Sequence, residues 1–291
     1  MRRLIINADD FGLTPGVNRA IVEAHANGIV SSATVMAGGA ARAAAVALSS
    51  ANPRLSVGCH LVLVDGKPVL DPAQVSTLLD SDTHGGIHFH SHLSRFATRA
   101  LAGKFAPEQI EAEAIAQIRA LQQSGITVSH FDTHKHTHIF PSVLRPLLQA
   151  AKACGISALR NPFGPRLPLS IRDIRQRPKL WKRLVEVRLL GLFASRFRQT
   201  VNQFGLRTPD GSFGVVSTGA LDLDLFNVII NAIPEGTWEF VCHPGYNDSD
   251  LASVRTRLRQ SREKELEILT STVASEALDR RGIQLISYRE L

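Results

Sequence analysis

The sequence is poor in cysteine and lacks long apolar runs, and both absences restrict what the protein can be. Its three cysteines, Cys59, Cys154 and Cys242, are an odd number without a close pair, which argues against a disulfide framework and favours a reducing cytoplasm. No apolar run approaches the roughly 20 residues that cross a bilayer. Asp9 and Asp10 interrupt the N-terminal apolar residues before a secretory signal can form. We therefore expect a cytoplasmic protein that does not span a membrane.

Common catalytic motifs are also missing. The sequence has no Gly-x-Ser-x-Gly nucleophile elbow, Walker loop or dinucleotide-binding glycine fingerprint in the required context, so a serine hydrolase or a nucleotide-dependent enzyme would lack its parts. The net charge of +7 and the pI of 9.8 invite a polyanionic partner, but stacking aromatics and a recognised nucleic-acid-binding motif are missing. A non-catalytic nucleic-acid-binding protein is therefore the weaker alternative, and we expect no nucleic-acid partner.

The positive charge is concentrated in one segment. Residues 166–207 contain eleven Lys or Arg and two acidic residues, a local excess of nine that exceeds the +7 of the whole chain. The rest of the chain is therefore slightly acidic. Residues 170–204 predict one or two basic amphipathic helices with Trp181, Phe193 and Phe197 among the arginines. These aromatic side chains would either pack inward or contact an anionic membrane surface.

Strand and helix patterns alternate along the whole chain. Strands are predicted at residues 2–7, 29–36, 55–64, 125–129, 156–160, 214–217, 237–242 and 283–288, and one long helix at 260–281. Seven or eight such units imply a parallel sheet and favour a closed or nearly closed barrel. We expect an α/β fold in one domain over residues 1–291, a distorted (β/α) barrel of seven or eight units like a TIM barrel. A loop excursion at about 65–105 and a basic helical insertion at about 166–207 would extend from it.

Polar side chains follow the carboxyl ends of several different predicted strands. They are Asp9, Asp10, His60, His134, Arg160 and His243. Barrel enzymes gather their catalytic groups at this edge, so we expect these side chains to lie close together.

The densest polar stretch runs from His130 to His138, His-Phe-Asp-Thr-His-Lys-His-Thr-His. If extended geometry continues through it, alternation places every second side chain from Asp132 to His138 on one face. Converging imidazoles suit a metal such as zinc, and the carboxylate would either complete the ligand set or hold a histidine ring from outside it. The alternative is a solvated polar loop.

Adjacent Asp9 and Asp10 cannot both point the same way in extended geometry. One could ligate a metal while the other accepts a proton from metal-bound water, although an Asp-rich turn that caps backbone amides is the alternative. His243, which precedes Pro244, could donate a proton to a leaving amine. Arg160 could orient a carboxylate or a substrate oxygen. A metal, a water, a base and an acid would form a hydrolytic site.

A second histidine group lies in the loop excursion and comprises His84, His88, His90 and His92. The last three alternate and could chelate a metal. The glycine-rich flanks and the lack of a nearby carboxylate partner favour a mobile loop instead.

Four motifs together resemble a known family. They are Ala8-Asp-Asp-Phe-Gly12, Gly58-Cys-His60, the His130–His138 stretch and Cys242-His-Pro244. In this order they are similar to the motifs of the YdjC-like carbohydrate deacetylases, the family of the chitooligosaccharide deacetylase. Within that family, the fragment His60-Leu-Val-Leu-Val-Asp-Gly-Lys-Pro68 is most similar to the hopanoid-biosynthesis-associated (HpnK) members.

The resemblance implies a hydrolase that removes acetyl from an N-acetylated sugar, in a distorted barrel that is often dimeric. It implies that Asp10, His60 and His134 hold one divalent metal ion, magnesium or zinc. It also implies that Asp9 is the general base and His243 the acid. We further expect Arg160, His136 and His138 to bind substrate, with the two histidines otherwise supporting the site.

For HpnK-like members the implied substrate is an N-acetylglucosaminyl hopanoid, and the product is the free glucosaminyl lipid. A chitooligosaccharide is the alternative. Lys135 stands where chitooligosaccharide deacetylases tend to have another histidine, and the basic segment is not part of their pattern. We therefore expect a lipid-linked substrate, peripheral contact with the inner membrane through residues 170–204, and a homodimer.

Overall fold

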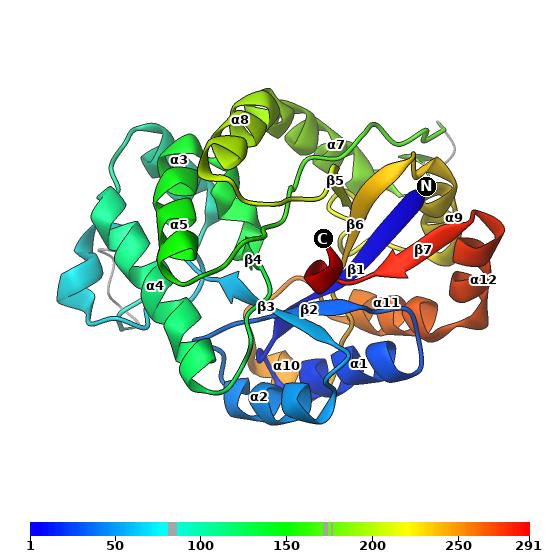
Figure 1. Cartoon of the computed structure of the whole chain (residues 1–291), viewed down its shortest axis with the longest axis horizontal. Helices are drawn as coiled ribbons and strands as arrows, with labels where there is room; N and C mark the ends of the chain where they lie inside the picture. Colours follow the sequence, from blue (N-terminus) through cyan, green and yellow to red (C-terminus); the bar gives the residue numbers. More distant parts are fainter. Residues whose placement is uncertain (81–85, 171–173, 176) are drawn as a thin grey trace.

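The strands of the protein form a parallel sheet that helices cover on its outer sides (Figure 1). The computed structural model describes residues 1–80, 86–170, 174–175 and 177–291. The strands are β1 (Arg2–Phe11), β2 (Ser32–Val35), β3 (Ser56–Leu61), β4 (Phe131–Thr133), β5 (Gly211–Phe213), β6 (Gly236–Cys242) and β7 (Ile283–Ile286). This confirms the predicted α/β class.

The α-helices are α1 (Pro15–Ala26), α2 (Arg42–Ala51), α3 (Leu93–Leu101), α4 (Pro107–Gln123), α5 (Pro141–Ala153), α7 (Pro178–Leu190), α8 (Ala194–Phe204), α9 (Leu223–Ala232), α10 (Ser249–Ser253), α11 (Gln260–Thr270) and α12 (Thr272–Arg280). The described residues also form the short 3-10 helices η1 (Pro72–Leu78), η2 (His134–Ile139), η3 (Gly191–Phe193) and η4 (Tyr288–Glu290). Helices α1 and α2 lie on one side of the sheet, and α7 and α8 lie on the opposite side (Figure 1).

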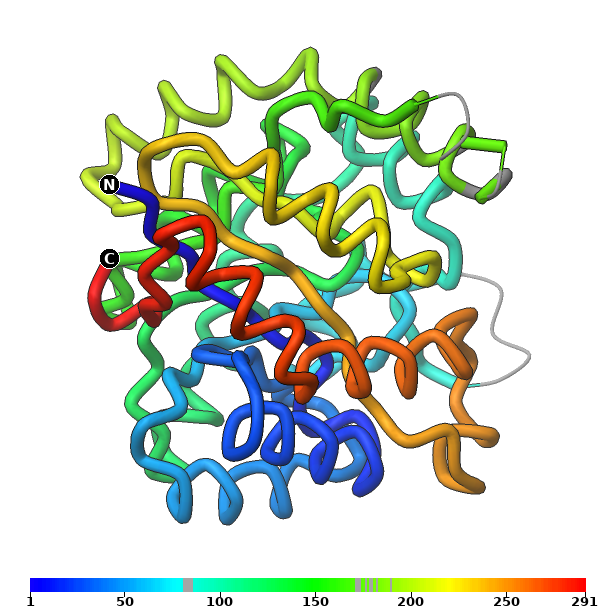
Figure 2. The backbone as a smooth tube through the Cα atoms, turned by 90° about the vertical axis from the view of Figure 1, so that its right-hand side faces the viewer, coloured from blue at the N-terminus to red at the C-terminus, as the bar shows by residue number. Residues whose placement is uncertain are grey.

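β1 is the central strand. The sheet order is β4-β3-β2-β1-β6-β5, and β7 pairs with β1 as well, so β1 contacts three parallel strands. Every residue from Leu4 to Phe11 is buried, as expected for a strand that is covered on both faces. In Figure 2, β1 runs from the N-terminus at the left towards the side where α10 lies. Asp9 and Asp10, near the carboxyl end of β1, are both buried.

The sheet is curved like part of a barrel, but the regular barrel of seven or eight units is not confirmed. The strand predicted at 156–160 makes only single parallel bridges, between Leu159 and Phe131 and between Ala158 and Arg207. Pro162 follows at once and has no N–H for a ladder. The strand predicted at 214–217 is wrong as well: β5 ends before Gly214, whose φ of +91° turns the chain.

Capping side chains set several helix ends. Thr14 Oγ1 accepts a hydrogen bond from Val17 N at 3.1 Å, and Pro15 stands at the first helical position of α1. The long helix predicted at 260–281 is instead two helices. Ser271 adopts an extended conformation and accepts from Ala274 N at 3.2 Å, so it starts α12 rather than continuing α11. Within the described ranges, no helix combines the length and apolarity that crossing a bilayer requires.

Candidate active site

Side chains from four segments meet at the carboxyl edge of the sheet. Asp9 and Asp10 lie near the end of β1, and His60 lies in β3. His134 and His243 directly follow β4 and β6. Because parallel strands end at one edge, residues that are far apart in the sequence become neighbours.

Three of these side chains place ligand atoms around a common point. Oδ1 of Asp10 lies 3.5 Å from Nε2 of His60 and 3.6 Å from Nδ1 of His134, and the two nitrogens are 3.3 Å apart. Oδ1 is buried and accepts no hydrogen bond from the described residues, although buried polar atoms normally have a partner. One carboxylate and two imidazoles suit zinc and similar divalent ions. Asp10, His60 and His134 could therefore hold a metal ion.

The backbone of Asp10 separates its side chain from that of Asp9. Its φ of 68° lies in the left-handed region, which is uncommon for a residue with a side chain and often marks functional sites. Burial alone would raise the pKa of Asp10, but the Arg262 guanidinium and the two imidazoles hold it well below its usual value. Asp10 is therefore an anionic carboxylate at neutral pH.

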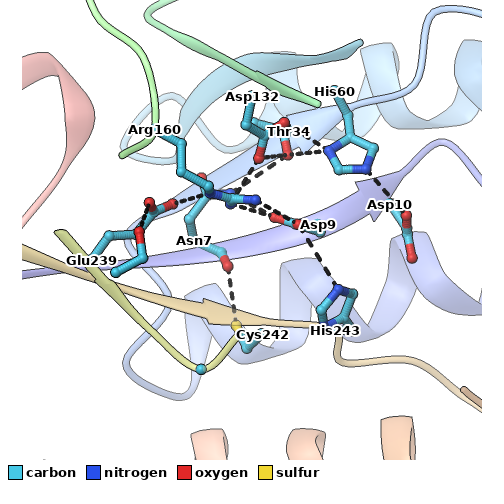
Figure 3. A network of polar contacts seen from close by, with 12 residues as sticks. Asn7, Asp9, Asp10, Thr34, His60, Asp132, Arg160, Glu239, Cys242 and His243 are labelled. Atoms are coloured by element: carbon cyan, nitrogen blue, oxygen red, sulfur yellow. Dashed lines mark hydrogen bonds and ion pairs between the residues drawn. The ribbon is translucent and has the colours of Figure 1, made fainter. Parts of the chain in front are cut away.

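Asp132 fixes the ring of His60 (Figure 3). Its Oδ1 lies 2.7 Å from His60 Nδ1, and Thr34 donates to its Oδ2 at 3.1 Å. Burial would lower the pKa of His60, but Asp132 and the nearby aspartates raise it to about 9, so a proton competes with a metal for the ring. The sequence left two roles open for the carboxylate of the His130–His138 stretch: completing the ligand set, or holding a histidine ring from outside it. The contacts match the second role, since Asp132 holds an imidazole whose other nitrogen faces Asp10.

Asp9 is buried and held by Arg160. Two guanidinium nitrogens donate to its two oxygens at 2.8 and 2.6 Å, and Asn7 Nδ2 donates to Oδ1 at 3.0 Å. Burial alone would raise the pKa of Asp9, but the guanidinium holds it far below its usual value. Asp9 is therefore an unprotonated carboxylate with a fixed orientation at neutral pH.

Arg160 has no exposed surface and contacts three carboxylates (Figure 3). Besides Asp9, it lies 2.7 Å from Asp132 and 2.9 Å from Glu239. These contacts do not support the substrate-binding role predicted for Arg160, because substrate cannot reach a side chain that is enclosed in this way. They match the alternative, in which Arg160 orients a carboxylate. Asp9, His60 and Asp132 also approach one another closely enough for a metal, but Arg160 already occupies both carboxylates.

His243 lies beside Asp9 rather than among the three ligand atoms. Its Nε2 is 3.8 Å from Asp9 Oδ2, its side chain is 12% exposed, and its main-chain N–H donates to Glu265 at 2.6 Å. Burial lowers the pKa of His243 to about 4 despite the two nearby aspartates. The ring is neutral at pH 7, so it must acquire a proton before it can donate one.

The alternation predicted for residues 132–138 is wrong. Lys135 and His136 have φ values of 55° and 54°, and the chain forms η2 instead of an extended strand. His138 is fully buried, its Nδ1 lies 2.6 Å from the Thr133 hydroxyl, and burial lowers its pKa to about 3. His138 is therefore enclosed and cannot touch substrate, whereas His136 is half-buried. Of the two roles left open for His138, the supporting one fits its position.

The second histidine group shows no metal-binding arrangement in the described part of the chain. His84 lies outside the described residues. His90 is buried with Nδ1 3.7 Å from Asp80 Oδ2, whereas exposed His92 lies 3.2 Å from an Arg255 nitrogen.

Sequence reasoning missed several residues that hold the site together. Thr34, Glu239, Arg262 and Glu265 are all buried and contact site residues. Nothing in the sequence singles out Thr34 or Glu239, because each looks like an ordinary strand residue. Arg262 could have been noticed, since it shares the spacing of the apolar residues of its helix.

Related proteins match this chain over nearly its whole length. The profile of a family described as YdjC-like protein matches residues 3–280. A carbohydrate deacetylase from Geobacillus stearothermophilus is 34% identical over 99% of this chain and 98% of its own length. A carbohydrate deacetylase from Vibrio parahaemolyticus is 30% identical over 99% of this chain and 96% of its own.

A solved structure has the same fold over nearly the whole chain. It is the crystal structure of a candidate cellobiose-phosphate cleavage protein from Enterococcus faecalis V583, with a TM-score of 0.78. It is 28% identical, and the match covers 99% of this chain and 98% of the other.

Proposed function

The chain belongs to the YdjC-like family, and from this premise we propose that it is a metal-dependent carbohydrate deacetylase that hydrolyses an N-acetyl group. The observation that carries the proposal is the cluster of Asp10, His60 and His134, with Asp9 and His243 beside it. The names of the relatives support the substrate class, since two of them are carbohydrate deacetylases.

The site contains the groups that amide hydrolysis requires. Asp10, His60 and His134 would hold one divalent ion, magnesium or zinc, which when bound supplies Lewis acidity to an acyl oxygen and lowers the pKa of water. Asp9 accepts a proton from the attacking water, and His243 Nε2, which lies 3.8 Å from Asp9 Oδ2, receives that proton once the two groups close to hydrogen-bond distance. As the C–N bond breaks, protonated His243 gives the proton to the departing amine. The products are acetate and an amino sugar.

The substrate we propose is an N-acetylglucosaminyl hopanoid, with a chitooligosaccharide as the alternative. The similarity of residues 60–68 to hopanoid-biosynthesis members supports the lipid-linked substrate. Lys135 also supports it, because its ammonium pairs with Asp65 at 2.6 Å and so ties two loops together at a position where chitooligosaccharide deacetylases tend to have histidine.

The proposed function is tested by mass spectrometry of N-acetylglucosaminyl hopanoid and chitobiose after incubation with the protein. We expect one acetyl group to be lost from the hopanoid, and we expect EDTA to stop the reaction and added zinc or magnesium to restore it. Conversion of chitobiose alone would select the alternative substrate. No deacetylation of either compound with metal present would contradict the proposal.

The basic segment supports peripheral membrane contact as part of this function. Leu180 and Phe197 pack inward, as the alternative reading of the segment predicted, but other apolar side chains do not. Trp181, Val185 and Leu192 are 62%, 44% and 81% exposed, at helical spacing with exposed Arg188 between them. Apolar side chains interleaved with arginine suit the surface of an anionic bilayer.

Replacing Trp181 and Leu192 together by Ser should weaken binding to phosphatidylglycerol vesicles about 10-fold or more, because burying each large apolar side chain contributes about 1.5–3 kcal/mol. Co-sedimentation measures this. The matched control replaces exposed Leu223 and Val273 by Ser on other helices and should bind like the parent. Equal loss in both variants, or no binding by the parent, would refute a docking surface on the basic segment.

A further inference from the structure

Helix α11 carries two buried ionisable residues that contact Asp10 and the main chain of His243. Arg262 and Glu265 are one turn apart and only 1% and 2% exposed. They lie on the same side of the helix as Leu266 and Leu269, which pack into the core. Charged side chains are almost never buried so completely without a specific partner, so the contacts of this pair decide its role.

Arg262 forms an ion pair with the carboxylate of Asp10. Its Nη2 donates to Oδ2 at 2.5 Å, and its Nε donates at 3.2 Å to the carbonyl of Leu258, which lies just before α11. With Oδ2 engaged, the other oxygen of Asp10 is the one that faces the two imidazoles. Arg262 therefore determines which oxygen Asp10 presents, and it offsets the cost of holding Asp10 at a left-handed φ.

The loop after His243 packs closely against the side chain of Arg262 at Gly245. A Cβ atom at Gly245 would lie 2.9 Å from Arg262 Cδ and 3.3 Å from its Cβ, and Gly245 N donates to the Arg262 carbonyl at 3.3 Å. Only a residue without a side chain fits this approach without displacing the arginine. The same loop thus carries His243 and makes room for Arg262.

Glu265 holds the main chain of His243. Its Oε2 accepts the His243 N–H at 2.6 Å and lies 3.9 Å from the Nδ1 atom of the ring. Burial raises the pKa of Glu265 to about 7, and the accepting oxygen holds this N–H at a short distance. It fixes the position from which the imidazole approaches Asp9.

We propose that Arg262 and Glu265 form a positioning pair, in which one helix presets both the metal ligand Asp10 and the proton donor His243. Neither residue touches reacting atoms, so each acts through another side chain. The inference rests on the proposed function and assigns a separate role to each residue. Arg262 sets the affinity for the metal, and Glu265 sets kcat.

The first test measures zinc binding to metal-depleted protein by titration calorimetry, without substrate. Arg262→Met should weaken zinc binding about 10–100-fold, the usual cost of losing a residue that orients a metal ligand, and Arg262→Lys should recover part of it. Affinity equal to or tighter than that of the parent would overturn the role of Arg262. Because no substrate is present, this result is independent of whether the protein is a deacetylase.

The second test separates Glu265 from Arg262. Glu265→Leu removes the acceptor and should lower kcat about 10-fold or more with little change in KM and parental zinc affinity. Glu265→Gln keeps an acceptor of the same length and should restore most of kcat. Equal losses in the two variants would show that charge rather than positioning matters, and a parental rate in Glu265→Leu would also overturn the role.

A third measurement keeps the proposal falsifiable if a single variant folds poorly. In a double-mutant cycle, Arg262→Met should cost little further zinc affinity once Asp10→Asn is present, because Arg262 acts through Asp10. Gly245→Ala leaves both side chains of the pair in place and crowds the arginine stem and Val17, and it should weaken zinc binding in the same direction. Additive losses in the cycle would overturn the proposal.

Discussion

Replacing Asp9 by Asn should lower kcat by about 10²–10⁴-fold while the protein still binds one equivalent of metal. In the parent protein, the Arg160 guanidinium donates to both carboxylate oxygens of Asp9. Asn has nearly the same shape and keeps one of these two acceptor oxygens. It cannot accept a proton from water. Since Asp9 is not among the three clustered ligand atoms, metal binding should survive. Steady-state kinetics and metal analysis of the same preparation measure both effects.

The matched control is Asp279→Asn, which makes the same chemical change on an exposed carboxylate of α12. It should have parental activity. Retained activity in Asp9→Asn would exclude Asp9 as the base, and joint loss of metal and activity would show that Asp9 holds the metal instead.

Replacing Arg160 by Met should lower the free energy of unfolding at pH 7 by about 3–5 kcal/mol, the usual cost of removing one partner from a buried ionic network. Arg160 is fully buried and contacts Asp9, Asp132 and Glu239, so its loss removes the guanidinium that three enclosed carboxylates share and leaves only the His60 ring paired with Asp132. Urea denaturation measures the effect. Arg54→Met, at an exposed position, should change stability by no more than about 0.5 kcal/mol.

The deficit of Arg160→Met should shrink as the pH falls. Even with Arg160 present, burial raises the pKa of Glu239 to about 7. Without the arginine, the folded-state pKa of Asp9 loses the cause of its depression, and the pKa values of Asp132 and Glu239 rise further above their unfolded values. A raised folded pKa means that the folded state binds the proton more tightly, so the stability of the variant is lost as the pH rises and regained as it falls from 7 towards about 5. A deficit that does not change with pH would argue that lost packing, not buried charge, is responsible.

The sequence by itself predicted that polar side chains follow the carboxyl ends of several parallel strands, although it placed the strand before His134 at 125–129 rather than at Phe131–Thr133. Alternating strands and helices predict parallel strands, and parallel strands end at one edge, so Asp9, Asp10, His60, His134 and His243 could be expected to meet. The types of side chain already indicated a metal and a hydrolytic reaction. These conclusions need only local patterns and the direction of the strands, which the sequence contains.

Only the tertiary structure decided which partner each polar group has. The predicted extended conformation ends at Thr133 because Lys135 and His136 adopt left-handed conformations. Neither residue type indicates such a conformation. Arg160 is enclosed by carboxylates from three other strands, and Arg262 reaches Asp10 across 252 positions of the chain. A buried charge must be paired, but the sequence cannot say with what, because the pairing depends on which distant side chains the packed core brings within hydrogen-bond distance.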